Sequence, residues 1–546
     1  MSEPLHVALI WHMHQPLYKD PLTQQYAAPW VRLHAARDYL RMAEVLARYP
    51  DVHATFNFVP VLVEQLLDYV SSQAVDRHLA LSRLACWDAE QKEQALAAFF
   101  DVDPEHVLGR NAHYMQLAQL RDDVQGEAIL LSNAYYRDLV ASFNLAWLPA
   151  RWAEQAAMLR DLRAKGKRFS SAEIATVLGV QTEILRRVMP AYVRLRQAGQ
   201  IEITTSPYYH PVLPLLYDIS SARDIRSDVV LPQRAIAYPE DARAQLELAV
   251  EFHRDWTGVS PSGLWPPEGG VCAAMLADVA GCGFSWLATD ENVLVRSLGT
   301  DVQRDAAGHV INPELLYRPY RMEVDGRSLA LLFRDRFLSD QIGFTYGHWQ
   351  ADRAVDDLIE RLHVIRDRLG RDAGRHLVVI ALDGENCWDA YEENGDAFLE
   401  RLYRAWSEDP TLRAVSVGEH LQQSPADVPL QRLASGSWIP SGFETWVGEP
   451  EQNAAWNLLA RTREHALRWL NQANGSDLAD SAERIWRHLY ASEGSDWFWW
   501  CFLPNQVNGR NPYHDLFLRH IAAVYQITGC AGYHEIVAQA VTESMG

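Results

Sequence analysis

Short apolar segments that end in polar residues recur along the first 390 positions of the chain. Segments of this kind predict β-strands. The predicted strands cover residues 6–11, 52–58, 201–205, 263–265, 284–288, 328–333 and 376–382. Helical patterns such as residues 240–255 and 352–369 separate most of them. This alternation predicts an α/β protein with a parallel sheet, and the number of units indicates a barrel.

Two stretches depart from this alternation. Between the second and third predicted strands, residues 62–198 are rich in leucine, alanine and arginine and poor in glycine and proline, which predicts a helical insertion. After residue 424 a Gly/Ser/Pro stretch leads into long helical patterns at residues 451–474, 478–493 and 515–527. We therefore expect a barrel domain over residues 1–424, insertion included, and a C-terminal helical domain over residues 425–546.

Charge and composition narrow the function classes. The chain carries 71 acidic and 50 basic residues, a net charge of -21, which repels nucleic-acid phosphates and anionic membranes. A neutral substrate fits better. No apolar segment reaches the roughly 18 residues of a membrane span, and the first residues form no signal-peptide pattern, so we expect a cytoplasmic protein. The six scattered cysteines include no C-x-x-C pair and predict reduced thiols.

Histidines follow two of the predicted strands. His12 and His14 come directly after the first strand, where the two-residue period points both imidazoles to one side. This spacing suits either metal binding or the binding of sugar hydroxyls, while the plainer alternative is a pair of satisfied histidines at a strand end. His210 lies in a proline-stiffened loop with two tyrosines after the third strand. Positions at the carboxyl ends of barrel strands favour a functional role.

Carboxylates follow two other predicted strands. Glu268 follows Trp265 and two prolines and precedes two glycines, which leave room for a ligand. Asp383 and Glu385 end a wholly apolar strand, and charges seldom end such a strand without a function. A barrel would bring Glu268 and Asp383 to one mouth as the carboxylate pair that glycoside hydrolysis requires. Asp383 with Glu385 is a weaker pair, because alternate residues need not converge on one bond.

Four motifs in this order resemble glycoside hydrolase family 57. They are His-Gln-Pro at 14–16, Ser-Pro-Tyr-Tyr-His-Pro-Val at 206–212, Trp-Pro-Pro-Glu-Gly at 265–269 and Asp-Gly-Glu-Asn-Cys-Trp at 383–388. The resemblance covers nearly the whole chain. It implies a (β/α)7 distorted TIM-like barrel with a helical domain beside it, and a retaining mechanism on α-glucans without metal or cofactor. It also implies Glu268 as the nucleophile and Asp383 as the general acid/base.

Further stretches are similar to the amylase and amylopullulanase branch of that family more than to its branching enzymes. They contain Asp335, the pair Trp438 and Trp446, and Asp496 with Trp497. The segment 501–506 departs from the acidic, histidine-containing run often found there. The chain has 19 tryptophans, whose faces can stack on sugars, although core packing accounts for most of them. The predicted substrate-binding residues are His12, His14, His210, Trp265, Asp335, Glu385, Trp388, Trp438, Trp446, Asp496 and Trp497.

The resulting hypothesis is a retaining enzyme that cleaves α-1,4 glucosidic bonds of maltooligosaccharides, glycogen or starch-like α-glucans, and the sequence leaves open whether α-1,6 bonds are cut as well. A 4-α-glucanotransferase acting on the same substrates is the nearest alternative. A metal-dependent polysaccharide deacetylase or amidohydrolase is a more distant one, with His12 and His14 joined by Asp383 or His210 as ligands. A non-catalytic glucan-binding protein is the third, although the intact Glu268 and Asp383 motifs favour an enzyme.

Overall fold

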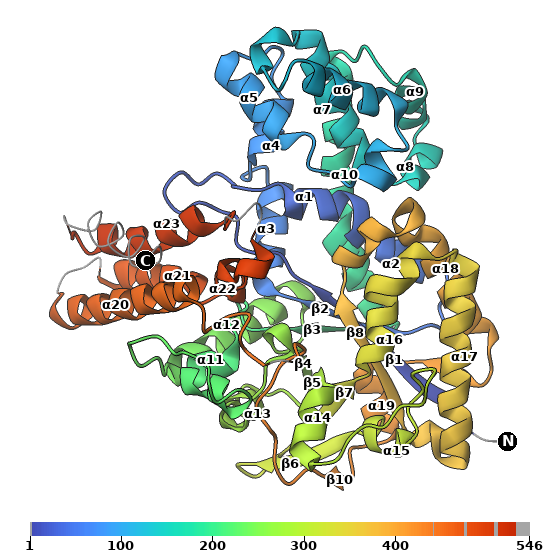
Figure 1. Cartoon of the computed structure of the whole chain (residues 1–546). Helices are drawn as coiled ribbons and strands as arrows, with labels where there is room; N and C mark the ends of the chain where they lie inside the picture. The colour runs from blue at the N-terminus through green and yellow to red at the C-terminus, as the bar shows by residue number, and fades with distance from the viewer. Residues whose placement is uncertain (1–2, 441, 474–477, 507–510, 531–546) are drawn as a thin grey trace.

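A closed ring of seven parallel strands forms the centre of the protein (Figure 1). The computed structural model describes residues 3–440, 442–473, 478–506 and 511–530. The ring strands are β1 (Leu5–Met13), β2 (Ala54–Phe58), β3 (Ile201–Thr205), β4 (Gly263–Leu264), β5 (Trp286–Asp290), β7 (Arg327–Arg334) and β8 (Leu377–Asp383). The ring closes because β8 pairs with both β1 and β7. This confirms the predicted (β/α)7 barrel.

Small and aromatic side chains fill the inside of this barrel. Alternate residues of β1, β5, β7 and β8 form a hydrophobic cluster separate from the main core, as the two-residue period of a strand requires. Alanines from these strands leave space that Trp265 and Trp286 fill, and both indoles are buried. The opposite faces of the strands pack against the surrounding helices in the main core. Burial on both faces explains why the strand sequences are continuous apolar runs.

Three further strands lie outside the ring. β6 (Tyr320–Val324) pairs antiparallel with β7, β10 (Val428–Pro429) extends β6, and β9 (Leu412–Ala414) pairs with β1. The sequence did not predict them, because β9 and β10 are only three and two residues long and β6 is only partly buried. They extend the sheet at its outer edge and contribute no residue to the mouth of the barrel.

Helices surround the ring, and a helical region rises above it between β2 and β3 (Figure 1). That region contains α3 (Pro60–Val70), α4 (Arg77–Ser82), α5 (Ala89–Ala98), α6 (Ala112–Asp123), α7 (Asn133–Ala146), α8 (Ala150–Gln155), α9 (Ala157–Lys165) and α10 (Ser171–Gln197). The long α10 returns the chain to the barrel. It starts at a capping box in which Ser170 and Glu173 satisfy each other's backbone N–H groups.

The remaining helices cover the outside of the barrel. They are α1 (Trp30–His34), α2 (Leu40–Leu46), α11 (Leu213–Tyr217), α12 (Pro239–Thr257), α13 (Leu276–Gly281), α14 (Glu291–Leu298), α15 (Pro313–Leu316), α16 (Arg336–Asp340), α17 (Ala351–Leu369), α18 (Asp396–Glu408) and α19 (Val417–Gln423). Among the described residues, no helix is both long and apolar enough to cross a membrane.

The C-terminal helices stand beside the barrel and reach its mouth (Figure 1). They are α20 (Pro450–Gln472), α21 (Leu478–Ser492), α22 (Ser495–Cys501) and α23 (His514–Ile527). A backbone hydrogen bond of 2.9 Å from the Ser495 N–H to the His210 carbonyl joins the start of α22 to the loop after β3. The C-terminal region is therefore part of the wall of the mouth.

The close approach of β4 to β5 gives a first prediction. A Cβ atom added at Gly263 would collide with the Trp286 indole, which is buried and held by its hydrogen bond to Glu202. Gly263→Ala should therefore lower the free energy of unfolding by about 1–3 kcal/mol. Urea unfolding measures this change. Gly281→Ala is the control, because its Cβ meets nothing within 4 Å, and equal stability of the two variants would contradict the expected collision.

Candidate active site

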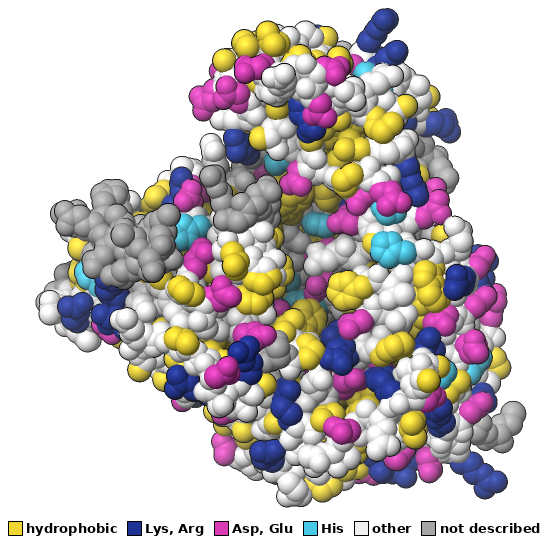
Figure 2. Space-filling view, viewed as in Figure 1, with side chains coloured by type: hydrophobic (Ala, Val, Ile, Leu, Met, Phe, Trp, Pro, Cys, Tyr) yellow, Lys and Arg dark blue, Asp and Glu magenta, His cyan; other side chains and the backbone are white. Residues whose placement is uncertain are grey.

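Two carboxylates lie at the mouth where the barrel strands end. Asp383 is the last residue of β8 and pairs with His12 of β1, while Glu268 follows β4. His210 lies 4.0 Å from Glu268 and 3.1 Å from His12, the partner of Asp383 in the sheet, so the two carboxylates share one site. The space-filling view is hollowed near its centre, where the insertion, the barrel and the C-terminal helices meet (Figure 2). The structure thus brings together the pair that the sequence predicted.

A strained turn presents Glu268. Its backbone has φ +60°, a left-handed conformation that is uncommon for a residue with a side chain. Two hydrogen bonds hold the turn, from the Trp438 N–H to the Glu268 carbonyl (2.9 Å) and from the Thr289 hydroxyl to the Gly269 carbonyl (2.6 Å). Such conformations cost energy and cluster at functional sites. The surrounding contacts therefore fix the direction in which the carboxylate points.

Both oxygens of the Glu268 carboxylate accept a hydrogen bond. The Ser495 hydroxyl donates to Oε1 over 2.9 Å, and the Trp438 indole N–H donates to Oε2 over 3.1 Å. Burial raises the pKa of Glu268 to about 7; the Ser495 hydrogen bond opposes the rise, and the charges of Asp496 and Asp383 add to it. Glu268 therefore changes its charge near neutral pH.

Asp383 has one engaged and one open oxygen. The Asn386 amide donates to Oδ2 over 3.0 Å, while Oδ1 has no hydrogen-bond partner among the described residues. Burial raises the pKa of Asp383, and the Asn386 hydrogen bond and the charges of His14 and Arg334 limit the rise. Arg334 is fixed at the end of β7, where it donates to Asp290 (2.8 Å) and to the Ala381 carbonyl (2.9 Å). Asp383 is partly exposed toward the mouth.

The rings of His12, His14 and His210 lie against one another at the mouth. His12 Nε2 lies 3.1 Å from His210 Nε2, and the rings of His14 and His210 stack with centroids 3.8 Å apart. Burial lowers the pKa of His12 to about 3 and that of His210 well below its ordinary value, and the neighbouring imidazoles add to both changes. A neutral imidazole offers one donor and one acceptor, and in His12 and His210 both are engaged, with Asn57, with Ser495 and with each other.

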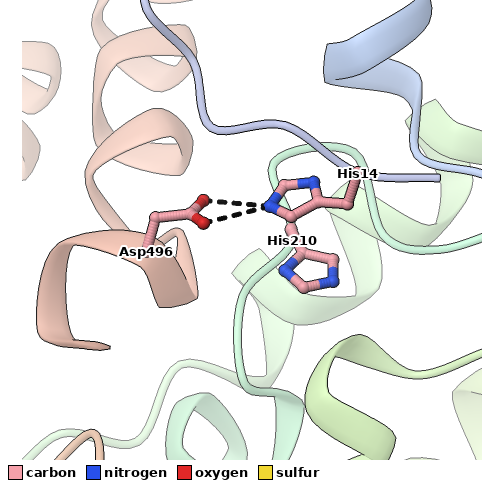
Figure 3. Close-up of side chains that lie close together, drawn as sticks. All are labelled: His14, His210 and Asp496. Carbon is pink, nitrogen blue, oxygen red and sulfur yellow. Dashed lines mark hydrogen bonds and ion pairs between the residues drawn. The ribbon is translucent and has the colours of Figure 1, made fainter. Parts of the chain in front are cut away.

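His14, His210 and Asp496 are the described group that comes nearest to a metal site (Figure 3). The His14 Nε2 atom lies 3.1 Å from both Asp496 carboxylate oxygens, and one ligand atom from each residue lies within 4.8 Å of the others. However, the two imidazole planes differ by only 18°. The lone pairs of stacked rings lie in parallel planes and do not converge on one ion. This geometry favours hydrogen bonding over chelation, and the absence of a metal stays a prediction.

Glu385 supports the loop after β1. Its Oε1 accepts hydrogen bonds from the His14 backbone N–H (3.1 Å), the Gln15 amide (3.2 Å) and the Tyr39 hydroxyl (2.8 Å). Burial and the charge of Asp383 raise the pKa of Glu385 well above its usual range. The Glu385 side chain is almost fully buried. Its hydrogen bond to the His14 backbone therefore holds His14 in place from inside the protein.

Other predicted binding residues are spread between the mouth and the core. Trp438 is partly exposed and packs on Trp265, which is buried. Asp335 caps α16 and is bound by Arg304 and Tyr317. The side chains of three further tryptophans are buried and present no face to the mouth, namely Trp388, Trp446 and Trp497. Their part in substrate binding stays a prediction.

Sequence reasoning missed three residues of the site. Ser495 precedes the predicted Asp496, Asn57 lies near the end of the second predicted strand, and Arg334 precedes the predicted Asp335. A polar residue close to the carboxyl end of a predicted barrel strand was the available signal for Asn57 and Arg334. Nothing local marked Ser495, because its importance comes from a contact with Glu268, 227 positions away in the chain.

A closed parallel barrel with a carboxylate pair at its mouth is the arrangement that a glycoside hydrolase requires. The sequence profile of glycosyl hydrolase family 57 matches residues 8–431. The chain belongs to this family, which confirms the resemblance seen in its motifs. No curated protein sequence matches the chain.

Solved structures with the same fold have several activities. A family 57-type branching enzyme from Pyrococcus horikoshii has 15% identity and a TM-score of 0.60, covering 99% of this chain and 94% of its own. An α-amylase from Thermotoga maritima has 14% identity and a TM-score of 0.57, covering 99% and 97%. A 4-α-glucanotransferase from Thermococcus litoralis has 14% identity and a TM-score of 0.52, covering 96% and 60%. At these identities the comparison shows the fold and does not separate the activities.

The raised pKa of Glu268 gives a prediction about stability. Its value of about 7 in the folded protein lies above the ordinary 4.5, so the folded state holds this proton more tightly than the unfolded state. The stability from this group is complete below about pH 4.5 and is lost as the pH rises through about 7. Glu268→Gln should therefore gain roughly 1–3 kcal/mol over the wild type between about pH 5 and pH 8.

Urea unfolding of both proteins across this pH range measures the gain, and the low-pH end serves as the internal control. A difference between the two proteins that does not change with pH would contradict the prediction.

Proposed function

We propose that the protein cleaves α-1,4-glucosidic bonds of maltooligosaccharides and related α-glucans with retention of configuration. The observation that carries this proposal is the arrangement of Glu268 and Asp383 at one mouth, with both oxygens of Glu268 held by donors and one oxygen of Asp383 open. Membership of family 57 supports the general reaction class. The names of the fold neighbours support an α-glucan as the substrate.

The contacts of the two carboxylates support their different roles. A nucleophile must be ionised and fixed in place, and Glu268 accepts two hydrogen bonds from Ser495 and Trp438. A general acid must carry a proton toward the leaving oxygen, and burial raises the pKa of Asp383 while Oδ1 remains open. Because the two groups repel each other when both are ionised, the pair favours a state with one shared proton.

The reaction then takes two displacement steps. A Glu268 oxygen forms a bond to the anomeric carbon as the glycosidic C–O bond breaks, and Asp383 gives its proton to the departing oxygen. Asp383, now ionised, removes a proton from water, whose oxygen displaces Glu268. His14 is suited to hold a hydroxyl of the reacting sugar, because its Nδ1 has no partner among the described residues, whereas the ring nitrogens of His12 and His210 are engaged within the protein.

The covalent intermediate also allows transfer to a second sugar. A sugar hydroxyl that occupies the position of water would react in the same way, which is the 4-α-glucanotransferase alternative. The partly exposed face of Trp438 is available for stacking on either sugar. Cleavage of α-1,6 bonds would need the same two carboxylates, so linkage choice depends on the walls of the mouth.

Variants of the two carboxylates test their roles. Glu268→Ala and Asp383→Ala should each lose about 10²-fold or more in kcat, because each removes one essential group. Azide should partly restore both. It attacks in place of Glu268 to give a glycosyl azide of inverted configuration, and it intercepts the covalent intermediate in Asp383→Ala to give the retained product. Proton NMR of the products distinguishes them, and full activity of either variant without azide would refute its role.

The substrate and the reaction are tested on maltotriose. At low concentration hydrolysis should dominate, because water is then the more abundant acceptor, and at high concentration products longer than maltotriose should appear. Time-resolved chromatography with an assay of new reducing ends measures both. If products longer than maltotriose formed faster than new reducing ends appeared at low maltotriose concentration, the protein would be a transferase instead. An inactive protein on maltooligosaccharides, glycogen and pullulan alike would refute the substrate class.

A further inference from the structure

A continuous chain of hydrogen bonds leads from Glu268 into the base of the mouth. Glu268 Oε1 lies 2.9 Å from Ser495 Oγ, which lies 2.9 Å from His210 Nδ1. His210 Nε2 lies 3.1 Å from His12 Nε2, and His12 Nδ1 lies 2.7 Å from the Asn57 side-chain atom placed as Oδ1, a position that the amide nitrogen takes after a half turn. Each link holds one hydrogen, and each neutral ring has one N–H and one lone pair. The chain therefore has a direction, and whatever fixes one end fixes the other.

The two possible directions leave Glu268 in different states. If Asn57 presents its oxygen, His12 must donate to it, and every donor in the chain then points away from Glu268. The carboxyl group would have to hold a proton itself to complete its link with Ser495. If Asn57 presents its amide nitrogen, the donors point the other way, and Ser495 donates to an ionised Glu268. An amide has nearly the same shape after a half turn, so its partners decide between the two.

The partners of Asn57 favour the amide nitrogen. Ser206 Oγ lies 2.6 Å from the Trp265 carbonyl and 3.0 Å from the Asn57 side-chain atom that faces His12. Ser206 has one hydrogen, and the short contact to the carbonyl uses it, so Ser206 meets Asn57 as an acceptor. Thr204 Oγ1, 3.2 Å from the other end of the amide, can then donate to the amide oxygen. This is the only orientation of the Asn57 amide in which each of these contacts has a donor and an acceptor. All of these side chains are buried.

We propose that Asn57 is a positioning residue that keeps Glu268 ready as the nucleophile. Its amide donates to His12 Nδ1, and the donors then run in one direction through both imidazoles and Ser495 to the Glu268 carboxylate. The proposal rests on the proposed function, because only a nucleophile requires the ionised form. Asn57 touches no reacting atom and acts through four hydrogen bonds in series.

Among the described residues, the hydrogen bonds of Asn57 go to His12, Thr204 and Ser206 and to none of the other charged groups around Glu268. Asp383 at the end of β8 and Asp496 on α22 oppose its ionisation, and His14 beside them favours it. The Arg334 guanidinium lies 5.2 Å from the centre of the Trp438 ring, which in turn binds Glu268. A change in the ionisation of Glu268 on substitution of Asn57 would therefore be transmitted by the chain.

The test is the pH profile of kcat/KM on maltooligosaccharides for Asn57→Leu, which removes the donor. The acid limb should move to higher pH by about half a unit to one unit, because the ionised carboxylate loses support from about one hydrogen bond. Thr55→Val is the matched control. Thr55 is also buried on β2, but it contacts Glu202 and the Val417 N–H, outside the chain, and its acid limb should not move. A downward shift in Asn57→Leu, or none, overturns the proposal.

Histidine tautomers in the wild-type protein give a second test that needs no variant at Asn57. With ¹⁵N-labelled histidine, the ring nitrogen shifts should place the hydrogen of His12 on Nε2 and that of His210 on Nδ1, with assignments from His12→Gln and His210→Gln. The opposite tautomers would overturn the proposal. If the protein cleaved no α-glucan, the proposed function would fail, but the tautomers would still decide the direction of the chain.

Discussion

The hydrogen bond from Ser495 to Glu268 joins two regions of the chain into one active site. The barrel alone supplies Glu268 on a strained turn, and the start of α22 supplies the donor that fixes Oε1. Buried contacts hold the two regions in register. Gln245 on α12 donates to Glu493 over 2.7 Å, and Arg463 on α20 pairs with Asp241 over 2.6 Å. Loosening this interface would move the donor away from the carboxylate without changing the barrel.

Burial of acidic groups in a strongly negative protein sets the chemistry of the mouth. Glu268, Asp383 and Glu385 all have raised pKa values, because burial removes water from the charged form. The site contains few positive charges to offset this. It depends instead on neutral donors such as the hydroxyl of Ser495, the indole of Trp438 and the amide of Asn386. Neutral donors stabilise an ionised carboxylate without adding a second charge to the site.

The barrel was predictable because its strands are buried on both faces, which leaves a continuous apolar signal in the sequence. The same rule placed Glu268 and Asp383, since residues that follow parallel strands meet at one end of the barrel. Ser495 was not predictable in this way, and Asn57 had only the weak signal of a polar residue near the end of a strand. Their importance comes from side-chain contacts between distant segments, and neither residue type differs from an ordinary helix start or strand residue. The strands outside the ring were missed because β9 and β10 are too short and β6 is only partly buried.

The structure departs most from the sequence-based expectation in the role of the tryptophans. The motifs suggested several aromatic faces for sugars, yet Trp265 and Trp388 are fully buried, the first inside the barrel and the second against Trp11 and Arg41. A seven-stranded ring lined by alanines needs large side chains to fill it, so packing uses the indole that follows β4. Trp438 packs against that indole at a tilt and donates a hydrogen bond to Glu268. Packing inside the barrel is in this way coupled to the position of the nucleophile.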